Sequence, residues 1–292
     1  MSSITVSIDN RVRLVGAVLA ASNWPDKAQD ILRHAVHPHA KLTRHFVTEH
    51  RDHAAVKTVN DALSAGVSLT DLFTAVVRAK WPTFDATESL PETVDPAWLS
   101  QLGDFYTDTG IAAFFWAEHE EPWTKADEDL KKIFKEDALI EYLAKVQGHS
   151  LKRTLNIVPN LTYPSLNTIV AYNETDTYLI IPPPKAVGES PPWPYGEGES
   201  WVLAESCRSL TSFLLASTMA QLNEQQQKLL RHGATVMFLD DHFDPFESRA
   251  YLVQKRKQES LPRLAEFVEK LRAHLDNDDG RSLLDMIQAE MP

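Results

Sequence analysis

Apolar residues in the first half of the chain recur at the spacing of helices. Residues 11–19 repeat at intervals of three and four, which predicts an amphipathic first helix. Proline, glycine and asparagine interrupt the pattern at residues 23–25, 37–39, 66, 81–82 and 91–96, so we expect a series of helices up to about residue 150. Ser68, three residues before Asp71, is a typical helix N-cap.

The pattern changes after Gly148. Residues 155–158, 168–172 and 177–181 are short runs rich in β-branched and aromatic residues, which predict three strands. Residues 182–198 are rich in proline and glycine, so we expect an ordered loop or flap there. A small sheet therefore follows the helices.

Helical spacing returns after the proline-rich segment. We expect helices over residues 199–221, 223–232, 247–257 and 262–275, with Gly233 ending the second in a left-handed conformation. The chain is thus predicted to have a mostly helical α+β fold. We expect an N-terminal helical subdomain over residues 1–150 and a second portion, with the sheet, over residues 151–292.

Charge and composition exclude several classes of protein. The 292 residues carry a formal charge of -12, which repels nucleic acids and anionic lipids. Cys207 is the single cysteine, so an internal disulfide is excluded and a reducing cytoplasmic compartment fits best. No apolar run reaches the roughly 20 residues that span a bilayer. The start of the chain imitates an export signal, but its short apolar run at helical spacing favours an ordinary helix.

Several stretches together are similar to a known group of proteins. They are residues 9–14, 45–46, 51–56, 102–109, 114–115 and 155–159. In this order they resemble a family of bacterial domains of unknown function related to gluzincin metallopeptidases. The resemblance covers most of the chain and implies a zincin-like metallopeptidase fold, in which a long helix carries the zinc ligands.

The resemblance also implies where a metal would bind. Two histidines four residues apart on one helical face coordinate zinc in the motif H-E-x-x-H, and the glutamate between them activates a bound water. The motif falls on residues 204–208, where Ala204 and Arg208 replace both histidines and Glu205 stands at the position of the general base. Glu247 is the best-placed counterpart of the third ligand.

These replacements predict that zinc is lost. Ala204 offers no lone pair, and Arg208 brings a permanent positive charge. A unit charge facing a dication at about 4 Å and an effective dielectric near 20 costs on the order of 8 kcal/mol. That is a large share of the roughly 10 to 16 kcal/mol that holds a structural zinc ion. We expect no bound zinc and no other cofactor.

Glu205 and Arg208 are three residues apart and within reach along a helix, so a helix salt bridge is the better interpretation of Glu205. If Glu247 faces the former metal position, the guanidinium of Arg208 would bridge Glu205 and Glu247 in a bidentate network. We state this three-residue network as a hypothesis for the structure.

Two other groups of residues have the composition of metal sites. Six of the eleven histidines lie within twenty residues, at poor spacing for one site, and we expect surface or capping roles for them. They are His34, His37, His39, His45, His50 and His53. Residues 240–244 combine three aspartates with His242, but loop solvation and helix capping explain them better than a cation does.

The remaining candidates have ordinary interpretations. Cys207 lacks a histidine on its own helix to act as its base, so we expect a buried thiol. The aromatic run at residues 114–116 has the spacing of core residues rather than of a ligand platform.

The function predicted from the sequence follows from the lost ligands. We expect a catalytically inactive zincin-like pseudopeptidase that acts as a peptide-binding or regulatory protein. An extended peptide would lie in a cleft along strand 177–181, under the loop of residues 182–198, by β-augmentation. The alternatives are an active metal-dependent hydrolase or peptidase with non-standard ligands, and a structural subunit. The sequence does not identify the ligand, the pathway or the oligomeric state.

Overall fold

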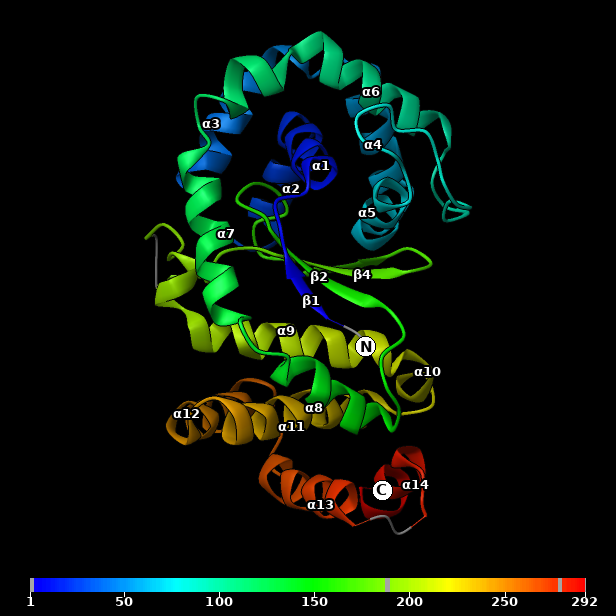
Figure 1. The fold of residues 1–292 in the computed structure, drawn as a ribbon, viewed down its shortest axis with the longest axis vertical. Coiled ribbons are helices and arrows are strands. Elements are labelled where there is room, and N and C mark those ends of the chain that lie inside the picture. The colour runs from blue at the N-terminus through cyan, green and yellow to red at the C-terminus, as the bar shows by residue number, and fades with distance from the viewer. Residues whose placement is uncertain (1–2, 187–189, 278–279, 292) are drawn as a thin grey trace. The chain divides into compact units, whose positions relative to one another are not determined.

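The computed structural model describes residues 3–186, 190–277 and 280–291. Its fold is mostly helical with one four-stranded mixed sheet, so the predicted α+β class is confirmed (Figure 1). The chain forms two compact units. We call Ile4–Lys135 with Arg153–Gly198 the sheet unit, and Glu136–Lys152 with the chain from Glu199 onward the helical unit.

These units divide the chain differently from the boundary expected near residue 150. The sheet belongs with the N-terminal helices because strand β1 (Ile4–Val6) pairs in parallel with strand β2 (Thr154–Pro159). The three residues of β1 are all β-branched, but so short a run falls below the four to eight residues that predict a strand. Its partner lies about 150 residues away, where only the folded chain brings the two together.

The sheet has the strand order β1-β2-β4-β3. Strand β4 (Asp176–Ile181) runs parallel to β2, and strand β3 (Ile169–Tyr172) is antiparallel to β4. The three strands expected after residue 150 are therefore confirmed within two residues of their predicted ends. The prediction that β4 accepts a peptide at its edge is wrong, because β2 and β3 already pair with its two sides. The outer strands are β1 and β3.

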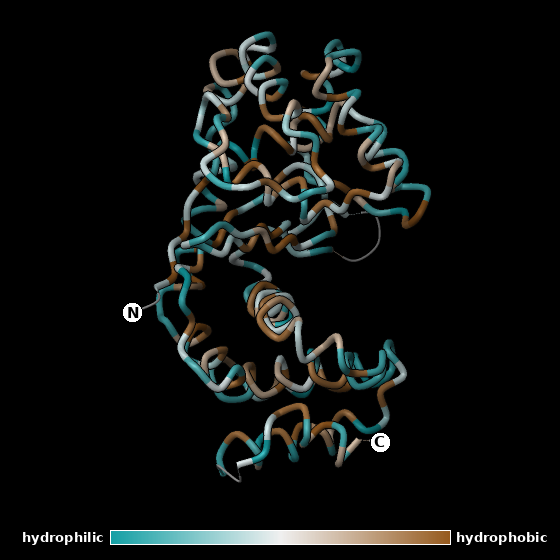
Figure 2. Tube along the Cα trace, turned by 90° about the vertical axis from the view of Figure 1, so that its right-hand side faces the viewer, coloured by the Kyte–Doolittle hydropathy of each residue, from teal (hydrophilic) through white to brown (hydrophobic). Residues whose placement is uncertain are grey.

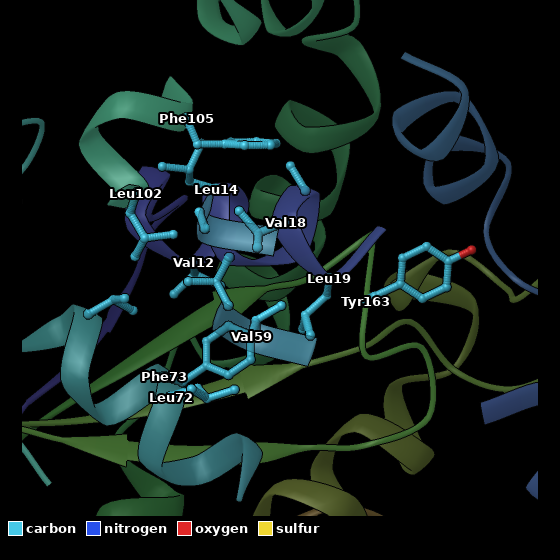
Figure 3. Close-up of a cluster of buried hydrophobic side chains, with 14 of the residues drawn as sticks. Val12, Leu14, Val18, Leu19, Val59, Leu72, Phe73, Leu102, Phe105 and Tyr163 are labelled. Atoms are coloured by element: carbon cyan, nitrogen blue, oxygen red, sulfur yellow. The ribbon is translucent and has the colours of Figure 1, made fainter. Parts of the chain in front are cut away.

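The core of the sheet unit surrounds helix α1 (Asn10–Ala21). Residues 12–20 are all buried, so the predicted first helix is confirmed but is enclosed on every face rather than amphipathic. Leu14, Val18 and Leu19 lie among side chains from several helices (Figure 3). The other helices of this unit are α2 (Trp24–Ile31), α3 (Pro38–Val47), η1 (Thr48–His50), α4 (Ala54–Ser64), α5 (Leu69–Val77), α6 (Ala97–Thr109), η2 (Ala112–Trp116) and α7 (Glu121–Ile133).

Local signals set several of these boundaries. Ser68 caps α5, where its side chain accepts a hydrogen bond from the backbone N–H of Asp71. Within η2, Phe115 and Trp116 are buried as expected for core residues, whereas Phe114 is 70% exposed. The proline-rich segment forms a loop that contains the short helix η3 (Tyr195–Glu197), and its residues 187–189 lie outside the described residues.

The helical unit is built around helix α11 (Glu224–His242), which contacts α8, α9, α12 and α13. The expected end of this helix at Gly233 is wrong. A Cβ atom at Gly233 would lie 2.5 Å from Cδ1 of Phe267, so the glycine serves close packing against α13 rather than a turn. The other helices are α8 (Ala138–Gln147), α9 (Glu199–Leu214), α10 (Ala216–Met219), α12 (Pro245–Gln258), α13 (Leu264–Asp276) and α14 (Leu283–Glu290).

Apolar and polar residues alternate along the tube rather than gathering in one long stretch (Figure 2). Within the described ranges, no helix is both long enough and apolar enough to cross a bilayer.

Candidate functional site on helix α9

Helix α9 runs without interruption through the positions where the resemblance places a metal motif. It packs against α8, α10 and α11 within the helical unit. Ala204 is buried, and its methyl group fills the position of the first predicted ligand. Glu205 and Arg208 are partly exposed on the same helix.

Glu205 and Arg208 form a closed ion pair. Nε of Arg208 donates to Oε2 of Glu205 at 3.0 Å, and Nη2 donates to Oε1 at 2.5 Å. The hydroxyl of Ser209 also donates to Oε1, at 3.3 Å. The predicted salt bridge is therefore present in bidentate form, and both carboxylate oxygens of Glu205 are engaged.

The ion pair holds Arg208 in its charged state. Burial works to lower the pKa of Arg208, but the hydrogen bond and the negative charge of Glu205 outweigh it and raise the pKa above its ordinary value. A guanidinium that keeps its charge repels a cation at this position. Arg208, which has no lone pair to donate, therefore cannot serve as a zinc ligand.

Glu247 takes a different position from the one in the hypothetical network. Its Oε2 accepts a hydrogen bond of 2.7 Å from the hydroxyl of Ser200. Ser200 lies eight residues before Arg208, or about 12 Å along a helix axis. Throughout the part of the chain that the structure describes, no hydrogen bond or ion pair joins Glu247 to Arg208. The predicted bridge of Arg208 to both carboxylates is thus not formed.

The buried side of α9 contributes a polar cluster with α11 and α12. Cys207 is fully buried, and burial raises the pKa of its thiol to about 12, so the predicted buried thiol is confirmed. Nearby, Nδ1 of His232 lies 2.8 Å from the hydroxyl of Tyr251. The sequence pattern did not indicate this pair, because it predicted that the helix of His232 ends at Gly233.

The clustered histidines have separate structural roles. His37 and His53 cap α3 and α4, because each ring accepts a hydrogen bond from a backbone N–H two residues later. His39 instead is buried and accepts a 2.8 Å hydrogen bond from Nε1 of Trp123. The capping prediction is confirmed for His37 and His53, whereas a surface position is wrong for His39.

The acidic segment at residues 240–244 also has structural partners. Asp240 and Asp241 belong to the last turn of α11 and pair with Arg272 at 2.9 and 2.6 Å. Asp244 caps α12 and accepts a hydrogen bond from the backbone N–H of Phe246. The capping prediction is confirmed for Asp244, and the expected loop is wrong for the two aspartates in the helix.

Over the described ranges, no three His, Cys, Asp or Glu side chains lie close enough together to hold a metal ion. Comparisons of the chain with models of protein families, with curated proteins and with solved structures give no match. The resemblance to gluzincins therefore stays a prediction. The function proposed below is based on the geometry of α9.

Proposed function

We propose that this chain is a catalytically inactive, zincin-like pseudopeptidase that binds an extended peptide without cleaving it. The observation that supports the loss of catalysis is the bidentate ion pair between Glu205 and Arg208. A general base needs a free lone pair directed at a water, and the ion pair uses both oxygens of Glu205. Helix α9 also contains no histidine to hold a metal that would activate that water.

Peptide binding is proposed at the outer edge of strand β3. The backbone N–H of Asn173 donates to the backbone carbonyl of Asp176. Because hydrogen-bonded and non-hydrogen-bonded residue pairs alternate along antiparallel strands, the backbone groups of Val170 and Tyr172 point away from β4. Arg78 already donates to the carbonyl of Tyr172. The N–H and C=O of Val170 have no hydrogen-bond partner among the described residues, so an added strand would pair with them.

Metal analysis of the purified protein, together with a peptide-library assay, tests the loss of catalysis. We expect zinc well below one equivalent and no cleavage. The double variant Ala204→His with Arg208→His restores two imidazoles but leaves Glu247 at Ser200, so we expect weak zinc affinity without peptidase activity. Stoichiometric zinc and cleavage by the unaltered protein would overturn the proposal.

Peptide binding is tested by screening a displayed peptide library and then substituting the edge. Val170→Pro removes the outward N–H, and we expect at least a tenfold loss of affinity for selected peptides. Val6→Pro on β1, the opposite outer strand, is the matched control and should leave affinity unchanged. Equal binding by both variants, or no selected peptide at all, counts against a peptide at β3.

A further inference from the structure

Arg13 is a buried cation in the sheet unit, within the interior helix α1. Its side chain is 5% exposed. Burial lowers its pKa to about 10, although the nearby carboxylate of Glu120 acts in the opposite direction. The guanidinium therefore stays charged at neutral pH. A buried charge is costly unless acceptors surround it, so its contacts need an explanation.

Among the described residues, the acceptors nearest to this guanidinium lie beside one of its nitrogens, Nη1. Nη1 lies 3.5 Å from Oδ1 of Asn10 and 3.7 Å from Oε2 of Glu120. Nε and Nη2 are buried and have no acceptor among the described residues. These two nitrogens direct their N–H bonds the same way and form the fork that binds both oxygens of a carboxylate.

Two indole rings limit how a ligand reaches that fork. The guanidinium carbon of Arg13 lies 4.4 Å from the ring centroid of Trp116 and 4.5 Å from that of Trp123. Both tryptophans are buried, on η2 and α7 respectively. Both indoles lie against the guanidinium, so a ligand has to reach Nε and Nη2 along the directions of their N–H bonds. A carboxylate, with its two oxygens, matches this pair of N–H groups better than a spherical ion does.

His39 adds another unsatisfied donor to the same region. Its Nε2 accepts the hydrogen bond from Trp123, so its proton lies on Nδ1. Burial, and then the charge of Arg13, lower the pKa of His39 to about 3, which keeps the ring neutral. Nδ1 is buried and lacks an acceptor within the described ranges. The region around Arg13 therefore presents hydrogen-bond donors without matching acceptors.

We propose that Arg13 binds the carboxylate of a small, free organic acid. The Nε and Nη2 fork binds the two carboxylate oxygens in the plane of the guanidinium, between the indoles of Trp116 and Trp123. Glu120, whose side chain is 52% exposed, lies 3.7 Å from Nη1 and competes as a carboxylate of the protein itself. The site is independent of α9 and goes beyond the proposed peptide binding.

Thermal unfolding with three additives at equal ionic strength tests the site. Sodium acetate supplies the planar carboxylate, acetamide supplies the same shape without charge, and sodium chloride supplies a spherical anion. We expect acetate to raise Tm by roughly 5 °C at about 100 times its Kd, because a ligand that binds the folded state stabilises it. Acetamide and chloride should not raise Tm. A response to chloride equal to that for acetate, or none to acetate, overturns the proposal.

Variants assign the effect to the fork. Arg13→Met keeps an unbranched side chain and should abolish the acetate shift. Glu120→Gln keeps Arg13 intact, removes the competing charge and should tighten acetate binding roughly fivefold. It also keeps the test decisive if Arg13→Met does not fold. Arg263→Gln, an exposed arginine paired with Glu266 in the helical unit, is the control and should retain the full shift. An acetate shift that persists in Arg13→Met, or is unchanged in Glu120→Gln, contradicts the assignment.

Discussion

Helices α1 and α9 each carry an arginine whose surroundings are opposite in character. Arg208 on α9 is 31% exposed and has a bidentate partner, Glu205, three residues away on the same helix. Arg13 on α1 is 5% exposed, and its nearest carboxylate lies 3.7 Å away on another segment. Nε and Nη2 of the more exposed guanidinium both bind a carboxylate, and the same two nitrogens of the more buried one have no acceptor among the described residues.

The two arginines therefore differ in whether Nε and Nη2 already bind a carboxylate of the protein. On α9 the fork of the arginine already holds a carboxylate, so nothing else can bind there without breaking the ion pair. On α1 the corresponding fork is buried and has no acceptor among the described residues, and contacts with two indoles partly offset the cost of burying its charge. The sheet unit of Arg13 also contains the buried His39, whereas the helical unit of Arg208 contains the buried His232 and the buried thiol of Cys207.

The largest effect concerns the buried histidines, one in each unit. Burial lowers the pKa of His39 and of His232 to about 3. Because the unfolded chain binds these protons near pH 6.5, stability is complete above that pH and falls as pH decreases toward 3. We expect a loss on the order of 3 kcal/mol per histidine at pH 4, measured by urea unfolding between pH 4 and 7.

Single variants divide this loss between the two units. His39→Gln and His232→Gln should each flatten the acid dependence by a similar amount. At pH 7, His232→Gln also loses the contact with Tyr251, and His39→Gln loses the hydrogen bond from Nε1 of Trp123. An acid dependence that neither variant changes would show that other groups cause it.

The next effect compares lysine at the two arginine positions. Arg13→Lys replaces a planar cation between two indoles by a strongly hydrated ammonium group, which we expect to cost on the order of 2 kcal/mol. Arg208→Lys keeps a charge beside Glu205 at a partly exposed position and should cost less than about 1 kcal/mol. Chemical denaturation measures both. Equal costs would contradict the difference between the unpaired fork of Arg13 and the paired fork of Arg208.

The smallest effect concerns Cys207, in the helical unit. Burial raises the pKa of this thiol from its ordinary value of 9.0 to about 12. The unfolded chain therefore loses the proton first, so the stability contributed below pH 9 decreases as pH rises toward 12. At pH 10 we expect a loss of about 1 kcal/mol relative to pH 9.

Cys207→Ala should lack this thiol-dependent part of the alkaline loss, whereas titrating tyrosines affect the variant and the unaltered protein alike. The native thiol should also react with a thiol reagent only after unfolding. Rapid reaction of the folded protein at pH 8 would contradict the buried position.

Local chemistry made much of the secondary structure predictable. Ser68 begins α5 because its hydroxyl accepts a backbone N–H that the helix itself leaves unpaired. The salt bridge of Glu205 and Arg208 was predictable for the same reason, since residues three apart on a helix meet whatever surrounds them. The three strands after residue 150 followed from their β-branched and aromatic composition.

Positions that depend on distant partners were not predictable in this way. Gly233 looks like the end of a helix, but it lies inside α11 because Phe267 packs against it. We predicted that Glu247 faces Arg208, but its carboxylate instead accepts a hydrogen bond from Ser200. Strand β1 is recognised only by its pairing with β2. Each of these outcomes depends on contacts between residues far apart in the chain.

The sequence by itself therefore determined the helical segments, their caps and the absence of histidine from α9. Those properties depend on backbone geometry and on residue identity within a few positions. Only the tertiary structure decided that the fork of Arg208 is occupied by Glu205 alone and that of Arg13 is not. The reason is physical: whether a buried guanidinium is satisfied depends on which acceptors the fold brings within about 3 Å, and those come from anywhere in the chain.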